Sequence, residues 1–229
     1  MKFFVAAIAL AAFTPEAPFN PFDDLALESA IERDQYRTCT SLVGADPQAG
    51  RDYAEKWAAE GGGAAALHCQ AVGDLAAGFP KLAAVRLMQI AERKDIGDGL
   101  LRARYLEQAA IAWLEAGAAE YADEAINDAI QLAPNAGELS LTAGIVNAAN
   151  QRWGQTISAI DAAAEQGFKS ADGLVARAKA HKALLNNLKA AEDVVGALRI
   201  DPFNLDALVL RGELQQLGIE IDANYQRSR

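Results

Sequence analysis

The sequence predicts an all-α fold in which pairs of helices stack into one domain around a large hydrophobic core. Of the 229 residues, 52% are hydrophobic and only 7% are aromatic, and the abundant alanine favours closely packed helices over a sheet. Apolar residues recur at helical spacing, whereas alternating β-branched runs and Asn-Gly hairpins are missing from the sequence. Equivalent positions also recur at a fixed offset of 34 residues, which indicates a repeat protein.

The first 23 residues are predicted to precede the folded domain. Residues 1–12 resemble a signal peptide, because Lys2 precedes an apolar run of about eleven residues that is too short to span a bilayer. Small residues near Ala11 suit cleavage, and no cysteine follows for a lipid anchor. We therefore expect export, in a bacterium to the periplasm; a buried N-terminal strand or helix of a cytoplasmic protein is the alternative. Three prolines make residues 13–23 a linker.

The 34-residue period is clearest on the second helix of each predicted pair. Ala122, Ile126, Ala129 and Pro134 recur as Thr156, Ile160, Ala163 and Phe168, and again as Ala190, Val194, Ala197 and Pro202. On the preceding helix, small residues at Gly144, Ala178 and Gly212 would let the two helices of a pair approach closely. The prolines would end the second helix, because proline cannot continue it.

The rest of the chain follows the same pattern less regularly. Residues 24–96 are predicted to form irregular repeats with an offset of 30 residues, and residues 97–202 to form regular ones. A loop containing Gly97 and Gly99 would join the two parts. We expect five helical pairs from about Asp24 to Arg199, then a solvating helix within residues 203–218 and a tail at 219–229.

Over Ala103–Gly218 the pattern resembles the tetratricopeptide repeat (TPR) family, whose repeats are 34-residue helix-turn-helix units. It departs from the family at Arg177 and Arg211, where leucine is preferred, and at Phe168, where proline is preferred. The resemblance implies a right-handed α-solenoid of about five TPR-like repeats plus a C-terminal capping helix. It also implies a non-enzymatic adaptor that binds another protein or an extended peptide.

In the family the first helix of each repeat lines a concave groove. Carried over by position, the groove residues are Arg104, Glu107, Ile111, Glu138, Leu141, Ile145, Asp172, Val175, Lys179, Asp206 and Val209. They contain an acidic ladder (Glu138, Asp172, Asp206) and an apolar ladder (Leu141, Val175, Val209), which together would suit a peptide with basic and aliphatic residues.

The acidic ladder also has a purely structural explanation. Each acid falls in the first turn of its helix, where a negative charge complements the helix dipole. Asn135 and Glu138 even have the spacing of a capping box. Capping and groove roles are compatible, so both stay open at this stage.

Cys39 and Cys69 lie 15 residues before Ala54 and Ala84, which are equivalent positions on consecutive repeats. The cysteines therefore occupy the same position on neighbouring first helices, which predicts a disulfide in an exported chain. Two free buried thiols are the alternative, because neighbouring helix axes are about 8–10 Å apart and a disulfide requires closer Cα atoms.

The sequence contains no catalytic or metal-binding motif that would indicate an enzyme, a metal or another cofactor. His68 and His181 are the only histidines, and neither belongs to a set of zinc ligands. The net charge of −10 disfavours nucleic acid, and no apolar run is long enough for a membrane span. Two alternatives to the adaptor are a self-associating homo-oligomer that docks through its final helix, and a repeat-built hydrolase.

Overall fold

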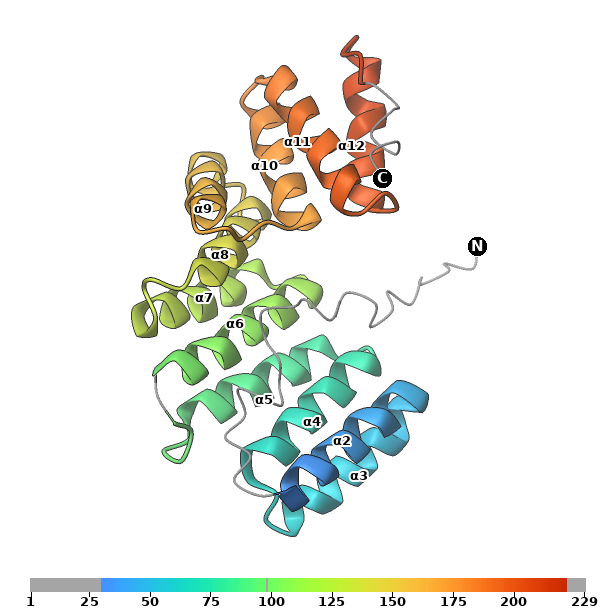
Figure 1. Ribbon diagram of the computed structural model, residues 1–229, viewed down its shortest axis with the longest axis vertical. Coiled ribbons are helices and arrows are strands. Elements are labelled where there is room, and N and C mark those ends of the chain that lie inside the picture. Colours follow the sequence, from blue (N-terminus) through green and yellow to red (C-terminus); the bar gives the residue numbers. More distant parts are fainter. Residues whose placement is uncertain (1–29, 98, 222–229) are drawn as a thin grey trace. The chain divides into compact units, whose positions relative to one another are not determined.

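The computed structural model describes residues 30–97 and 99–221, and this part of the chain forms eleven α-helices in succession (Figure 1). The helices are α2 (Ala30–Ala45), α3 (Pro47–Ala59), α4 (Gly63–Ala76), α5 (Pro80–Glu92), α6 (Gly99–Glu115), α7 (Ala119–Leu132), α8 (Gly137–Ala149), α9 (Trp153–Glu165), α10 (Ala171–Ala183), α11 (Asn187–Ile200) and α12 (Leu205–Gln216). The predicted signal peptide (1–12), the linker (13–23) and most of the predicted tail lie outside the described residues.

The helices pack in sequence, and the all-α fold of TPR-like helical pairs is confirmed. The chain divides into two compact units, one up to Gly117 and one from Ala118 onward. In the first unit, each helix from α2 to α5 packs on the helix that follows it, and α2 also packs on α4. In the second unit, each helix from α7 to α11 packs on the helix that follows it, α8 also packs on α10, and α10 also packs on α12. Within each unit, a helix therefore contacts mainly its neighbours in sequence, as in a solenoid.

The helix ends follow from local sequence. Asp46 caps α3, its carboxylate accepting hydrogen bonds from the backbone N–H groups of Gln48 (3.0 Å) and Ala49 (3.4 Å). Helices α7 and α11 end two residues before Pro134 and Pro202, as predicted. The boundary between the units follows α6, so the predicted loop with Gly97 and Gly99 lies inside the first unit.

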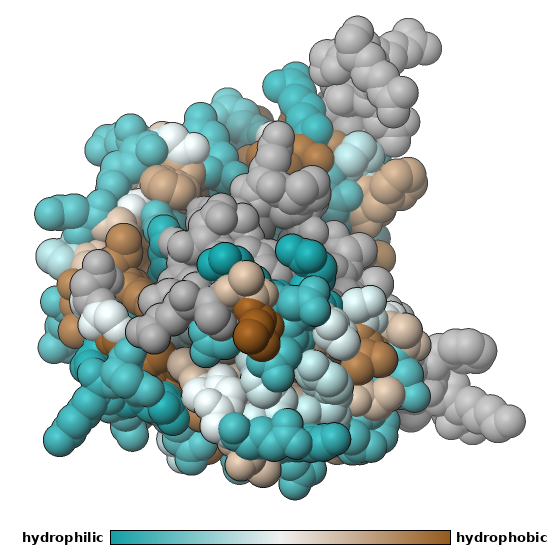
Figure 2. All heavy atoms as spheres, turned by 60° about the horizontal axis from the view of Figure 1, so that its bottom comes forward, coloured by the Kyte–Doolittle hydropathy of each residue, from teal (hydrophilic) through white to brown (hydrophobic). Residues whose placement is uncertain are grey.

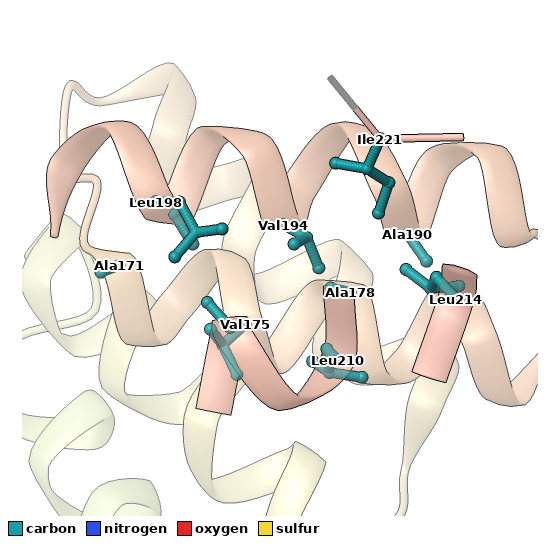
Figure 3. Packing of buried hydrophobic residues seen from close by; sticks show 11 residues of the cluster. Ala171, Val175, Ala178, Ala190, Val194, Leu198, Leu210, Leu214 and Ile221 are labelled. Atoms are coloured by element: carbon teal, nitrogen blue, oxygen red, sulfur yellow. The ribbon is translucent and has the colours of Figure 1, made fainter. Parts of the chain in front are cut away.

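Small residues allow the close helix packing that the repeat pattern predicts. A Cβ added to Gly144 of α8 would overlap Ile160 Cδ1 of α9, so this pair of helices requires glycine there. In the last helical pair and the helix after it, a hydrophobic cluster joins α10, α11 and α12 through Val175, Val194 and Leu210 among others (Figure 3). Hydrophobic and hydrophilic side chains are interspersed on the face drawn in Figure 2.

The predicted disulfide is present. Cys39 of α2 and Cys69 of α4 are bonded, with a Cα–Cα distance of 6.4 Å, and both side chains are fully buried. Helices α2 and α4, the first helices of two consecutive pairs, therefore approach closely enough at the two cysteines to bring their Cα atoms within the range of a disulfide. The bond links α2 to α4 and closes a loop that contains all of α3.

Candidate functional site

The predicted groove residues of the first unit lie on α6. Arg104 and Glu107 are half-buried, and Ile111 is 43% exposed. In the second unit, Glu138 and Ile145 of α8 are also half-buried, whereas Asp172, Lys179 and Asp206 are exposed. The exposed charged members therefore lie on α10 and α12.

Polar side chains connect α10 to α12 across this surface. Lys179 Nζ lies 2.6 Å from an Asp206 carboxylate oxygen, so two predicted groove residues form an ion pair with each other. Lys182 and Glu213 make a second pair at 2.6 Å. Asp172 accepts a hydrogen bond from the Asn204 side chain at 2.9 Å. Part of the acidic ladder is therefore neutralised by groups on the neighbouring helix.

The capping explanation of the acids holds only in part. The N-cap of α8 is Ala136, which makes no side-chain capping bond, so the predicted capping box of Asn135 and Glu138 does not form. Ser170 Oγ and Asn204 Oδ1 instead cap α10 and α12 by accepting backbone N–H bonds of 3.0 Å each. Asp172 and Asp206 lie in the first turns of α10 and α12, where their charge favours the helix.

The apolar ladder is not a continuous exposed stripe. Val175 is only 4% exposed and belongs to the core cluster, so we remove it from the predicted groove. Leu141 is half-buried, and its Cδ1 would be 2.5 Å from a Cβ placed on Gly173 of α10. These positions face the following helical pair, and Val209 remains 53% exposed. Spacing along the chain could not distinguish a position facing the next pair from one facing a groove.

The structure contains a cleft that the sequence did not predict. It has a volume of about 380 Å³ in the second unit and is lined by residues of α8 to α11, with mostly apolar surface. Leu141, Ile160, Phe168 and Leu174 supply apolar side chains to its lining. A Cβ on Gly196 would lie 3.1 Å from Leu174 Cδ1, so this glycine keeps that part of the cleft open. The only feature of the sequence that indicates this cleft is Gly196, a glycine in the interior of α11.

Some of the charged groups that border the cleft are paired with neighbouring side chains, and others are exposed. Arg177 donates two hydrogen bonds to Asp193, at 3.0 and 2.7 Å, and another to Asp161, and the bonds to Asp193 raise its pKa. This explains why arginine replaces the leucine of the TPR pattern, because it joins α10 to α9 and α11. Lys169 and Glu192 are exposed and form no ion pair within the described residues.

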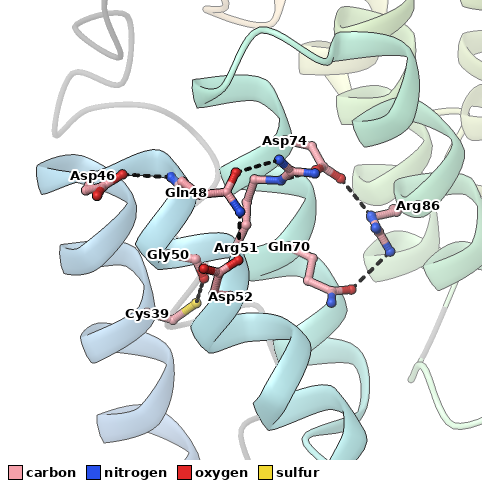
Figure 4. Close-up of polar contacts among 9 residues, drawn as sticks. All are labelled: Cys39, Asp46, Gln48, Gly50, Arg51, Asp52, Gln70, Asp74 and Arg86. Carbon is pink, nitrogen blue, oxygen red and sulfur yellow. Dashed lines mark hydrogen bonds and ion pairs between the residues drawn. The ribbon is translucent and has the colours of Figure 1, made fainter.

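The first unit has another charged cluster, in which the central residue is a buried acid instead of an arginine (Figure 4). Asp74 of α4 is 1% exposed and accepts hydrogen bonds from Arg51 Nε of α3 at 2.8 Å and Arg86 Nε of α5 at 2.6 Å. Gln48 and Gln70 accept further bonds from these arginines. The cluster ties three consecutive helices together. Its arginines are 12 and 23 residues from Asp74, so no repeat spacing predicts it.

Both histidines are held in structural environments. The Tyr36 hydroxyl lies 2.7 Å from His68 Nδ1, and His68 Nε2 lies 2.9 Å from Gln108 Oε1. Because Gln108 Oε1 is an acceptor, Nε2 carries the proton and Nδ1 accepts from tyrosine. Burial lowers the pKa of His68 to about 4, so it is neutral near pH 7. His181 is 7% exposed, and burial lowers its pKa as well.

The described residues include no group of three or more His, Cys, Asp or Glu that could hold a metal ion. None of the described helices is both long and apolar enough to cross a membrane. No protein-family model matches the chain, and no curated protein matches it either.

Solved structures that resemble this fold at low sequence identity include the following three proteins. The thermophilic TPR protein TTC0263 of Thermus thermophilus aligns with a TM-score of 0.59 and 19% identity, covering 81% of this chain and 99% of its own. Pseudomonas aeruginosa PilF aligns at 0.62 and 16%, covering 80% and 82%. YrrB, described as a TPR protein with an unusual peptide-binding site, aligns at 0.56 and 18%, covering 84% and 98%. At these identities the likeness concerns the fold, which is the fold of TPR proteins.

Proposed function

We propose that this chain is an exported, non-enzymatic adaptor that binds an extended segment of another protein through its second unit. TPR folds typically bind proteins, and the similar protein YrrB has a peptide-binding site. The observation that carries the proposal is the cleft of about 380 Å³, which is large enough for two or three apolar side chains. The larger part of its exposed lining is apolar, which suits apolar groups of a ligand, and charged residues complete the lining.

The unpaired charges beside the cleft favour one kind of segment. Lys169 and Glu192 line the same cleft with opposite charges. A peptide with two apolar side chains, preceded by a residue of one charge and followed by one of the other, would satisfy both. The exposed surface of α10 and α12 with Asp172, Lys179 and Asp206 would extend the contact along the chain.

The disulfide supports the exported location, because disulfides persist in oxidising compartments such as the periplasm. The apolar run in residues 1–12 is the sequence feature behind the same proposal. N-terminal sequencing of protein recovered from the producing cell tests it. Cleavage near Ala11 or Ala12 supports export, and an intact Met1 in the cytoplasm contradicts it.

A peptide titration tests the binding site. The probes are two short peptides, each with Phe-Leu at its centre; one has Glu before and Lys after this pair, and the other has the reverse order. Backbone NMR shifts should move at Leu174 and Gly196 for one of the two orders. Replacing Gly196 with Leu should abolish binding, because the new side chain fills the cleft beside Leu174. Gly154→Leu is the matched control, since an added Cβ there meets nothing within 4 Å.

The same titration has two outcomes against the proposal. If neither peptide shifts any resonance, the cleft does not recognise a segment of this chemistry. If Gly196→Leu binds as well as the wild type, the peptide binds elsewhere. In that case the variant Lys179→Ala shows whether the surface of α10 and α12 is the site.

A further inference from the structure

We propose that the disulfide is a redox-sensitive latch on α2, which holds this helix against α4 while the bond is intact and releases it when a dithiol reduces the bond. The remaining helices of the first unit, α3 to α6, keep their fold in both states. The latch is closed in an oxidising compartment and open in a reducing one. This inference concerns the first unit and is independent of the cleft and of peptide binding.

Helix α2 buries only a narrow face. Of its sixteen residues, Tyr36, Cys39 and Val43 are buried, and their spacing of three and four positions places them in one stripe along the helix. Helix α4, on which α2 packs, buries eight of its fourteen residues. An isolated helix about as long as α2 is marginally stable in water, so α2 depends on the contacts that hold this stripe in place.

Two side chains of the stripe bind α4. Cys39 is bonded to Cys69, and the Tyr36 hydroxyl lies 2.7 Å from Nδ1 of His68. The disulfide is the stronger of the two ties, because it closes a loop over a sequence separation of 30 residues and so restricts the unfolded chain, whereas one hydrogen bond adds little net stability. Reduction therefore removes the main attachment between α2 and α4.

The C-terminal end of α2 is attached to α3 instead. A Cβ added to Gly50 of α3 would lie 2.3 Å from Val43 Cγ2, so the two helices are in close contact there, and Asp46 alone joins them along the chain. Helix α3 is in turn tied to α4 through the ion pair on Asp74. That end stays in place when the disulfide breaks, so α2 opens from the Tyr36 end.

Reduction of the bond requires this opening, because Cys39 and Cys69 are both 0% exposed in the folded unit. A thiolate of the reductant attacks one sulfur and breaks the S–S bond, which leaves a mixed disulfide and one cysteine thiolate. The second thiol of the reductant then breaks the mixed disulfide. The two cysteines gain two electrons and two protons in total, and the dithiol is oxidised to its own disulfide. A protein or small-molecule disulfide reverses these steps and closes the latch.

Hydrogen exchange of the full chain tests the release of α2. After reduction with dithiothreitol, the amides around Tyr36 should exchange within about tenfold of the unstructured rate, whereas amides of α5 and α6 should stay protected at least about a hundredfold. The double variant Cys39→Ser, Cys69→Ser should show the same pattern without reductant. The proposal is overturned if α2 stays as protected as α5 and α6. It is also overturned if all helices of the first unit lose protection together.

The rate at which dithiothreitol reduces the bond tests whether α2 controls access to it. Tyr36→Phe removes the contact with His68 and should speed reduction by about threefold to tenfold, the effect of one hydrogen bond.

The matched control is Ile90→Val on α5, a helix that packs on α4 and α6. This residue is 0% exposed, so its truncation weakens the unit by a similar amount, and it should change the reduction rate by less than about twofold. Urea unfolding confirms that both variants are folded and similarly destabilised. Equal acceleration by the two variants would show that the bond is reached by unfolding of the whole unit, and acceleration by neither would show that it is reached without movement of α2. Both results contradict the latch.

Discussion

Replacing Asp74 with alanine should destabilise the first unit strongly, although Asp74 belongs to neither binding surface. Its carboxylate is 1% exposed and holds Arg51 of α3 and Arg86 of α5 through bonds of 2.8 and 2.6 Å. Hydrogen bonds to charged groups contribute about 1.5–3 kcal/mol each, and removing one member of a buried ion pair leaves the others uncompensated. The arginine side chains are 25% and 28% exposed, so water takes up part of the loss. We expect a loss of about 3 kcal/mol.

Urea unfolding followed by tryptophan fluorescence measures this loss, because Trp57 and Trp113 are both buried in the first unit. Hydrogen exchange should show the lost protection in α3 to α5. The control is Glu60→Ala, which removes an exposed i,i+4 pair with Lys56 and should change stability by less than about 0.5 kcal/mol. If Asp74→Ala costs no more than this control, the three-helix ion cluster does not stabilise the unit, and our reading of Figure 4 is wrong.

Three further predictions concern the disulfide, the buried histidine and a close contact between two helices. Reducing the disulfide between Cys39 and Cys69 should lower the free energy of unfolding by about 3.5 kcal/mol for a loop of this length. Urea unfolding with and without reductant measures this loss. A thiol assay should find no free thiol before reduction. Burial holds the pKa of His68 at about 4, below its unfolded value of 6.5, so the unfolded state binds more protons and the free energy of unfolding should fall as the pH drops from 6.5 to 4. Unfolding measured across this pH range should show a weaker pH dependence for His68→Gln. An unchanged pH dependence in this variant would contradict the assignment to His68. Gly144→Val should destabilise by about 1–3 kcal/mol through overlap with Ile160, and adding Ile160→Ala should recover part of the loss; additive losses would contradict the contact.

The sequence by itself determined the repeat architecture. Small residues such as Gly144 and Ala178, bulky ones such as Ile160 and the prolines that end α7 and α11 recur at a constant offset. Each repeat buries the same face against its neighbour, so periodicity in the sequence becomes periodicity in packing. The cysteine pairing followed from the same logic, because equivalent positions on stacked first helices are neighbours in space.

The tertiary structure alone decided which positions are available to a partner. Leu141, Val175 and Val209 are equivalent in sequence, yet one lines a cleft, one is buried in the core and one is exposed at the end of the described helices. Burial depends on whether another helix follows, and a local pattern does not contain that information. The sequence also did not predict the clusters around Asp74 and Arg177, because the ion-pair partners of each come from the two neighbouring helices at spacings unrelated to the repeat. Charge pairing across helices depends on side-chain direction and distance, which only the packed structure sets.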